Sequence, residues 1–162
     1  LVPVELLVEK LLFNPFVEGI TISGGEPFLQ AEALAEFMRQ ARRKRDLSLI
    51  CFTGYRLDQL QALSTTNGSQ NLLSQIDVLI DGPYIADLND NRGLRGSSNQ
   101  VVHHLTDRLK FYDFETQPRN AEIHIRDGEM MFVGVPPQGV IPRVVRDVHS
   151  FSSKAQGTYE RA

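Results

Sequence analysis

Residues 19–27 read GITISGGEP, and this short stretch decides how the rest of the chain is interpreted. Ile20 and Ile22 are typical of a buried β-strand, after which Gly24 and Gly25 leave the backbone without side chains. A helical pattern follows at once, so the glycines are expected at the C-terminal end of the strand, where α/β folds bind their ligands. Two adjacent glycines there predict that a ligand approaches the backbone closely.

Two further apolar runs are similar to the run that contains this strand, VEGITIS at 17–23. They are LSLICFT at 47–53 and IDVLID at 76–81, and each run leads into a segment able to form a helix. The second and third runs are nearly continuous in apolar residues, which is typical of parallel strands covered on both faces. Apolar residues at helical spacing over 29–45 predict an amphipathic helix between the first two. The pattern indicates repeated βα units.

The remaining segments differ in character. An amphipathic helix is predicted over PVELLVEKLLFN at 3–14, and the polar stretch NDNRGLRGSSNQ at 89–100 predicts a loop. Alternation in AEIHIRDGEMMFVGV at 121–135, broken by an Asp-Gly pair, predicts a β-hairpin. Residues 136–162 are expected to form a loosely attached tail.

Length and charge limit the classes of function. The 162 residues are one domain by size, and their formal net charge of -3 argues against a nucleic-acid binder led by electrostatics. The basic run Arg42–Arg45 is expected to be a solvent-exposed helix end. No apolar run approaches the roughly 20 residues that a membrane-spanning helix needs. We therefore expect a cytoplasmic protein that binds neither nucleic acid nor membranes.

The single cysteine and the paired histidines do not indicate a metal site. Cys51 is the only cysteine, which excludes an internal disulfide and any site built from several thiolates of this chain. It lies inside an apolar run, so it is expected to be a small core residue. His103 and His104 are neighbours on a predicted strand and point to opposite faces, so they cannot bind one ion together.

Four segments together carry a family resemblance. GITISGGEPFLQ at 19–30, FTGY at 52–55, IDVLIDGPY at 76–84 and LRGSSNQ at 94–100 resemble the radical S-adenosylmethionine activating enzymes, especially the activating proteins of anaerobic ribonucleotide reductase and their single-cluster relatives. The resemblance implies an incomplete parallel (β/α) barrel over residues 1–135, lacking its first strand and ending in the hairpin. A missing strand leaves an exposed edge that is open to pairing and self-association.

The resemblance also implies a cofactor site. The GGEP turn would place Ser23, Gly24, Gly25 and Glu26 beside the methionyl ammonium of S-adenosylmethionine, where glycine carbonyls and a carboxylate suit a cation. The alternative is a plain strand-to-helix turn in which Glu26 stabilises a helix N-terminus.

Further site residues are implied at the ends of the later strands and in the polar loop. They are Thr53, Gly54, Tyr55, Asp81, Arg95, Ser97 and Asn99. Arg95 would pair with the cofactor carboxylate, because a guanidinium matches a carboxylate bidentately. Three alternatives remain open: Tyr55 is a half-buried packing residue, Asp81 forms a turn, or the polar loop bonds to its own backbone.

The departure from the family pattern concerns iron. Family members hold a [4Fe-4S] cluster with three cysteines in a CxxxCxxC loop, and residues 1–162 contain no such loop. We expect a fragment that lacks the cluster segment and is inactive alone. The alternatives are a degenerate relative acting as a small-molecule or protein-binding module and, less in keeping with the sequence, a flavodoxin-like phosphate-binding domain.

The resemblance finally implies the activity of a parent protein. Such an enzyme would cleave S-adenosylmethionine reductively to a 5'-deoxyadenosyl radical and form a glycyl radical on a partner enzyme, in this case anaerobic ribonucleotide reductase. Its electron donor would be a flavodoxin or ferredoxin.

Overall fold

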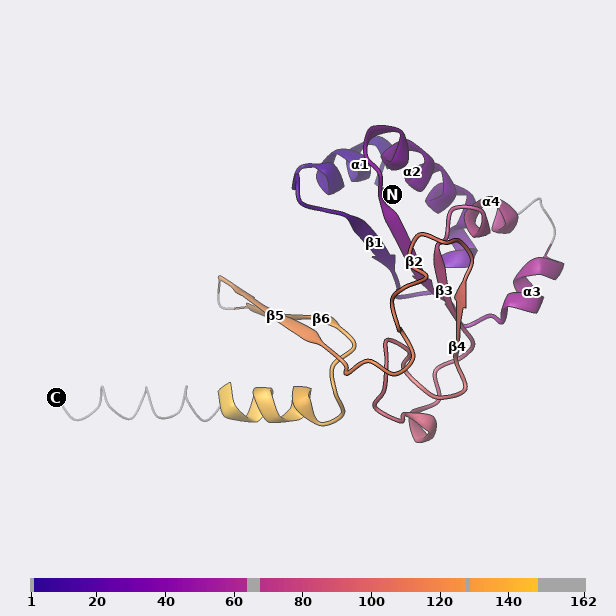
Figure 1. The fold of residues 1–162 in the computed structure, drawn as a ribbon. Helices are drawn as coiled ribbons and strands as arrows, with labels where there is room; N and C mark the ends of the chain where they lie inside the picture. The colour runs from indigo at the N-terminus through magenta and orange to yellow at the C-terminus, as the bar shows by residue number, and fades with distance from the viewer. Residues whose placement is uncertain (1, 64–67, 128, 149–162) are drawn as a thin grey trace.

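A four-stranded sheet forms the centre of the computed structural model, which describes residues 2–63, 68–127 and 129–148 (Figure 1). The strand order is β1-β2-β3-β4. β1 (Gly19–Ile22), β2 (Ser48–Phe52) and β3 (Val78–Asp81) run parallel, and β4 (Val101–His104) lies antiparallel to β3. The three predicted strands are confirmed. The expectation of a wholly parallel sheet is wrong at β4, because the polar loop returns the chain without a crossover helix.

Two helices in the N-terminal third bury apolar faces against this sheet. α1 (Val4–Leu12) and α2 (Ala31–Lys44) match the two predicted amphipathic helices, and the short 3-10 helix η1 (Pro27–Gln30) leads into α2. Met38 of α2 is fully buried, which is worth about 1.5–3 kcal/mol. Its core cluster includes Leu49 and Cys51 of β2. The smaller elements are α3 (Leu57–Ala62), α4 (Ser69–Leu73) and the 3-10 helix η3 (Ala86–Leu88).

Two arginines of the basic run are structural, so the expectation of a solvent-exposed helix end holds only for Arg43 and Lys44. Arg42 Nη2 donates to Asp77 Oδ2 at 2.6 Å, and this carboxylate lies buried beside the start of β3. Arg45 donates to the carbonyl oxygens of Leu12, Asn14 and Val17, which lie after α1 or at its last residue. The run thus ties α2 to the neighbouring elements.

The hairpin forms a second sheet of its own. β5 (Ala121–Arg126) and β6 (Glu129–Gly134) pair antiparallel, and Asp127 adopts a positive φ of 52° in the turn. The predicted hairpin is confirmed, although Gly128 lies outside the described residues. In Figure 1 the hairpin projects away from the four-stranded sheet.

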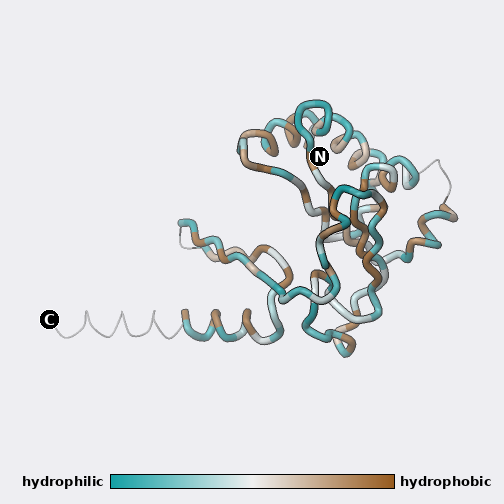
Figure 2. Tube along the Cα trace, viewed as in Figure 1, coloured by the Kyte–Doolittle hydropathy of each residue, from teal (hydrophilic) through white to brown (hydrophobic). Residues whose placement is uncertain are grey.

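Residues 140–148 form a helix that the expectation of a tail did not include. The helix also projects from the sheet (Figure 1), and its apolar residues gather along one side (Figure 2). Just before it, the Gln138 backbone N–H donates to Asn91 Oδ1 at 2.7 Å, which fastens this segment to the polar loop. Residues 149–162 lie outside the described residues. No helix in the described part of the chain is long and apolar enough to span a membrane.

Candidate functional site

Glu26 joins the turns that follow β1 and β2. Its Oε1 accepts hydrogen bonds from Thr53 Oγ1 at 2.8 Å and from the Phe28 N–H at 3.0 Å, while Oε2 accepts from the Gly54 N–H at 2.9 Å. The Phe28 bond places the carboxylate at the N-terminus of η1, as the strand-to-helix alternative expects. Glu26 therefore holds the rim of the sheet together through donors of the protein itself.

The two glycines before Glu26 open a cavity of about 240 Å³ at this rim. Gly24 and Gly25 have φ angles of +78° and +54°, and a Cβ at either position would meet nothing within 4 Å. Neither glycine, nor Ser23 before them, makes a hydrogen bond to another described residue. The three residues line the cavity with backbone donors and acceptors that remain available to a polar ligand.

The cavity brings together five of the residues predicted for the site. These are Ser23, Gly24, Gly25, Thr53 and Gly54. The rest of its lining was not predicted and consists of Phe52, Gly82, Tyr84, Gly96, Gln100 and Val135. Since β1, β2 and β3 are parallel, their C-terminal ends meet here as expected.

Gln100 fixes the wall of this cavity opposite the glycine turn. Its Oε1 accepts from the N–H groups of Gly96 at 2.8 Å and Ser97 at 3.2 Å, and its Nε2 donates to the Gly82 carbonyl oxygen at 2.8 Å. Gln100 is 7% exposed. One amide thus joins the end of β3 to the polar loop, and both segments line the cavity.

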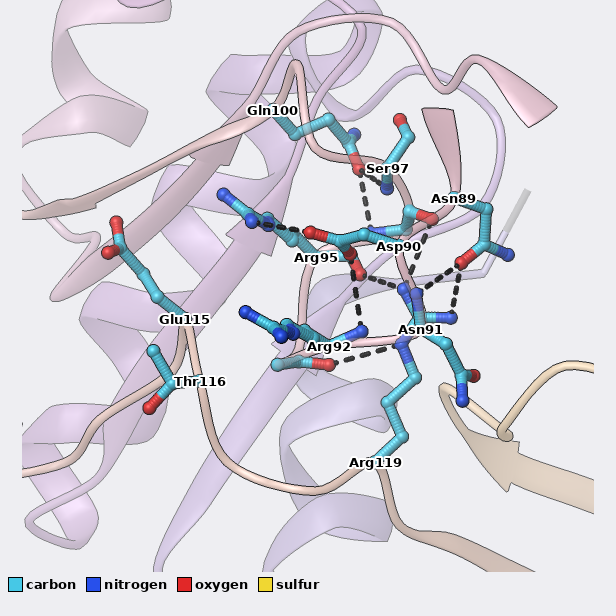
Figure 3. A network of polar contacts seen from close by, with 12 residues as sticks. Asn89, Asp90, Asn91, Arg92, Arg95, Ser97, Gln100, Glu115, Thr116 and Arg119 are labelled. Atoms are coloured by element: carbon cyan, nitrogen blue, oxygen red, sulfur yellow. Dashed lines mark hydrogen bonds and ion pairs between the residues drawn. The ribbon is translucent and has the colours of Figure 1, made fainter. Parts of the chain in front are cut away.

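Arg119 holds the same loop from the other side (Figure 3). The buried guanidinium donates to the carbonyl oxygens of Arg95 at 2.7 Å, Gly96 at 3.2 Å and Gly93 at 3.3 Å, and to Asn89 Oδ1 at 2.8 Å. Such a fan of donors can organise a loop that has no regular secondary structure. Sequence reasoning missed Arg119, because nothing near it in the chain indicates these partners.

Arg95 is engaged within the loop. Its Nη2 donates to Asp90 Oδ2 at 2.7 Å (Figure 3). Desolvation opposes ionisation of Asp90, but the Arg95 guanidinium and the Arg92 backbone N–H outweigh it and hold the pKa of this carboxyl below its ordinary value. Arg95 therefore already has a carboxylate partner, and it does not line the glycine-rich cavity.

Asp81 and Asn99 line a different cavity, of about 600 Å³, beside α3. Asp81 Oδ2 accepts from the Leu57 N–H at 2.6 Å and lies 2.9 Å from His103 Nε2. Asn99 Nδ2 donates to the Pro83 carbonyl oxygen at 2.7 Å. The predicted single rim is thus divided, because the side chain of Asp81 points to the helix-covered face of the sheet.

The remaining two predicted residues, Tyr55 and Ser97, contact the core cluster and the Ile85 backbone, respectively. Tyr55 is half-buried against the main core cluster, as its alternative expects, and Ser97 Oγ accepts from the Ile85 N–H at 3.1 Å. Gln100 is the last residue of the LRGSSNQ segment, and its place in that segment is the signal that could have identified it.

Residues 1–162 do not fit an iron–sulfur cluster. Cys51 is buried in β2, and burial together with the nearby Glu26 carboxylate raises the pKa of its thiol to about 12. Clusters are held by several thiolates, and this thiol is protonated at neutral pH. Among the described residues, no three His, Cys, Asp or Glu side chains form a group able to hold a metal ion.

Comparisons with known proteins agree with the resemblance seen in the sequence. A family model described as a 4Fe-4S single cluster domain matches residues 4–103. The anaerobic ribonucleoside-triphosphate reductase-activating protein of Escherichia coli is 38% identical over 93 residues, which cover 54% of this chain and 56% of that protein. The protein of the same name from Haemophilus influenzae is 38% identical over 90 residues, covering 53% and 55%. The chain thus matches about half the length of these relatives. No solved structure matches it significantly.

Proposed function

Because the chain belongs to the 4Fe-4S single cluster domain family, we propose that residues 1–162 supply the S-adenosylmethionine-binding part of an enzyme that activates a glycyl-radical partner. The observation that carries the proposal is the glycine-rich cavity at the C-terminal ends of the parallel strands. The names of the relatives support anaerobic ribonucleotide reductase as the partner. The cluster thiolates and the first strand of a barrel of radical S-adenosylmethionine type would then come from outside these residues.

The chain's own residues support binding of the amino-acid end of the cofactor. The unpaired backbone groups of Ser23, Gly24 and Gly25 offer carbonyl oxygens to an ammonium and N–H groups to a carboxylate. Glu26 directly follows this turn, so its carboxylate would add negative charge near a bound cation while its bonds to Thr53 and Gly54 keep the rim in place. The adjoining cavity of about 310 Å³ shares Tyr84 and Gly96 with the first and leaves room for a longer ligand.

When bound, S-adenosylmethionine would undergo reductive cleavage, for which a reduced iron–sulfur cluster would supply the electron. The role left to residues 1–162 is to bind and orient the cofactor. We expect these residues alone to bind the cofactor and to produce no 5'-deoxyadenosine.

Titration calorimetry with S-adenosylmethionine tests the binding step on this chain. Gly25→Val should reduce affinity about tenfold or more, because a β-branched residue is strained at φ +54° and its side chain enters the cavity. Asp127→Val is the matched control, since Asp127 also has a positive φ, of 52°, and is exposed, but lies in the β5–β6 turn outside both cavities. Equal affinity in wild type and Gly25→Val would remove the turn from the site.

Anaerobic reconstitution with iron and sulfide tests the activity. The chain expressed with any segment that its gene encodes before Leu1 should become brown and produce 5'-deoxyadenosine. A colourless, inactive protein that still binds S-adenosylmethionine would favour the non-catalytic binding module.

A further inference from the structure

The β5–β6 hairpin has one wholly apolar face. Cross-strand partners share a face, and the register pairs Ile123 with Phe132 and Ile125 with Met130. Ile125 is 72% exposed and Ile123 is 44% exposed, whereas Met130 and Phe132 are half-buried. The β5 half of this face is therefore the half that lacks cover.

The outer edge of β5 is also unpaired. β5 pairs only with β6 among the described residues, so every second residue directs its N–H and C=O groups away from the hairpin. A two-stranded hairpin is marginally stable by itself and gains stability from further strands or a covered apolar face. An added strand on β5 would provide both.

The charged residues on the polar face of β5 indicate which strand could pair with its outer edge. Glu122, His124 and Arg126 alternate with the apolar residues along the strand. If a second β5 pairs antiparallel about a two-fold axis at His124, Glu122 of each copy lies opposite Arg126 of the other. The same register places Ile123 opposite Ile125. Both symmetric ion pairs and both apolar pairs therefore form at once.

We propose that a second copy of this chain pairs with β5 and completes a four-stranded antiparallel sheet. The pairing extends the apolar face across both hairpins and leaves their charges on the opposite face. The proposal does not depend on the proposed function, because it uses neither the glycine-rich cavity nor any cofactor.

Other unpaired strand edges lack this complementarity. β6 carries one charged residue, Glu129, so it cannot form an ion pair with a second β6. β1 and β4 also have no second partner among the described residues, but GITI in β1 has no charge and VVHH in β4 has no carboxylate to fix a register by an ion pair. The charge order therefore favours β5.

A charge exchange tests the register by sedimentation velocity on the full chain. Wild type should dimerise with rising concentration, and Glu122→Arg or Arg126→Glu alone should weaken dimerisation about tenfold, because each sets like charges opposite one another twice. The double variant Glu122→Arg/Arg126→Glu should regain wild-type association. Arg43→Glu on the exposed side of α2 is the matched control and should leave association unchanged. A monomeric wild type, or a double variant as weak as the single ones, would overturn the proposal.

A cysteine cross-link tests the same register directly. His124 faces itself across the axis, at a spacing that a disulfide can bridge. Mild oxidation of His124→Cys should give a covalent dimer, whereas Glu122→Cys should not, because its opposite residue is Arg126. The buried Cys51 does not interfere. A linked Glu122→Cys dimer, or no linkage of His124→Cys, would contradict the pairing.

Discussion

Gln100 Nε2 donates a 2.8 Å hydrogen bond to the carbonyl oxygen of Gly82, and this bond joins the C-terminal end of β3 to the polar loop. The same amide accepts from two N–H groups of the loop, so its three bonds form one unit. Both joined segments line the glycine-rich cavity. The shape of the candidate site therefore depends on a residue outside the glycine turn.

Replacing Gln100 should loosen the loop in a graded way. Gln100→Glu keeps the two accepted bonds but turns an oxygen toward the Gly82 carbonyl, whereas Gln100→Leu loses all three bonds. We expect the free energy of unfolding to fall by about 1–3 kcal/mol, more for leucine. Hydrogen exchange at the Gly96 and Ser97 amides should rise in Gln100→Leu, with Gln61→Leu at an exposed position of α3 as the control. Unchanged exchange would show that the loop is held without this residue.

A substitution of Arg119 that keeps its charge but not its guanidinium group should destabilise the fold. Lysine cannot reach the three carbonyl oxygens and Asn89 Oδ1 together, so Arg119→Lys leaves buried acceptors unpaired. We expect a loss of about 2–4 kcal/mol in urea unfolding. Arg92→Lys, at an exposed position of the same loop, should change stability by less than about 0.5 kcal/mol. Equal stabilities for the two variants would exclude this function of Arg119.

The buried Asp77 carboxylate should be the most sensitive charged group of the sheet. It accepts from Arg42 at 2.6 Å, from the Leu49 N–H at 2.8 Å and from Thr106 Oγ1 at 2.7 Å. Arg42→Ala removes the closer of the two guanidinium groups beside Asp77 and leaves only Arg108 Nε, at 3.6 Å from Oδ1, so it should cost up to about 3–5 kcal/mol in chemical denaturation. Arg43→Ala, one residue along the same run, should cost little. Similar losses would mean that the run acts only as a solvated helix end.

The fold was predictable where the signal is local. The apolar runs around Ile20, Leu49 and Leu79 and the helical spacing over 29–45 are properties of neighbouring residues, so strands and helices followed from them. The antiparallel direction of β4 was not predictable, because it depends on how the polar loop folds on Gln100 and Arg119. The helix at 140–148 had a signal in its valine spacing, but the adjacent prolines favoured a tail. Pro142 lies in its first turn, where proline is tolerated.

In the candidate site too, some residues could be predicted from local sequence and others could not. Gly24, Gly25 and Thr53 lie at strand ends, and parallel pairing alone places them together. Asp81 also lies at a strand end, but the alternation of side chains directs it to the other face of the sheet. Gln100 and Arg119 act through backbone groups that are distant in sequence, so no residue-type pattern identifies them.

The buried Cys51 thiol should make the free energy of unfolding depend on pH. Burial, with the nearby Glu26 carboxylate, raises the pKa of its thiol from 9.0 to about 12. The unfolded chain therefore releases this proton at a lower pH than the folded one, so the contribution to stability is intact below about pH 9 and is lost as the pH rises toward 12. Between about pH 8 and 10.5 the loss from this group alone should be about 2 kcal/mol.

Comparing wild type with Cys51→Ala isolates that contribution, since every other titrating group is common to both proteins. Alanine lowers stability at all pH values by leaving a small cavity, but the difference between the two free energies of unfolding should shrink as the pH rises. The measurement is urea unfolding at a series of pH values. Alkylation by iodoacetamide at neutral pH should also be slow until the chain unfolds, because the thiolate is the reactive form. A difference that stays constant with pH, together with rapid alkylation of the folded chain, would show that Cys51 is accessible and ionises normally.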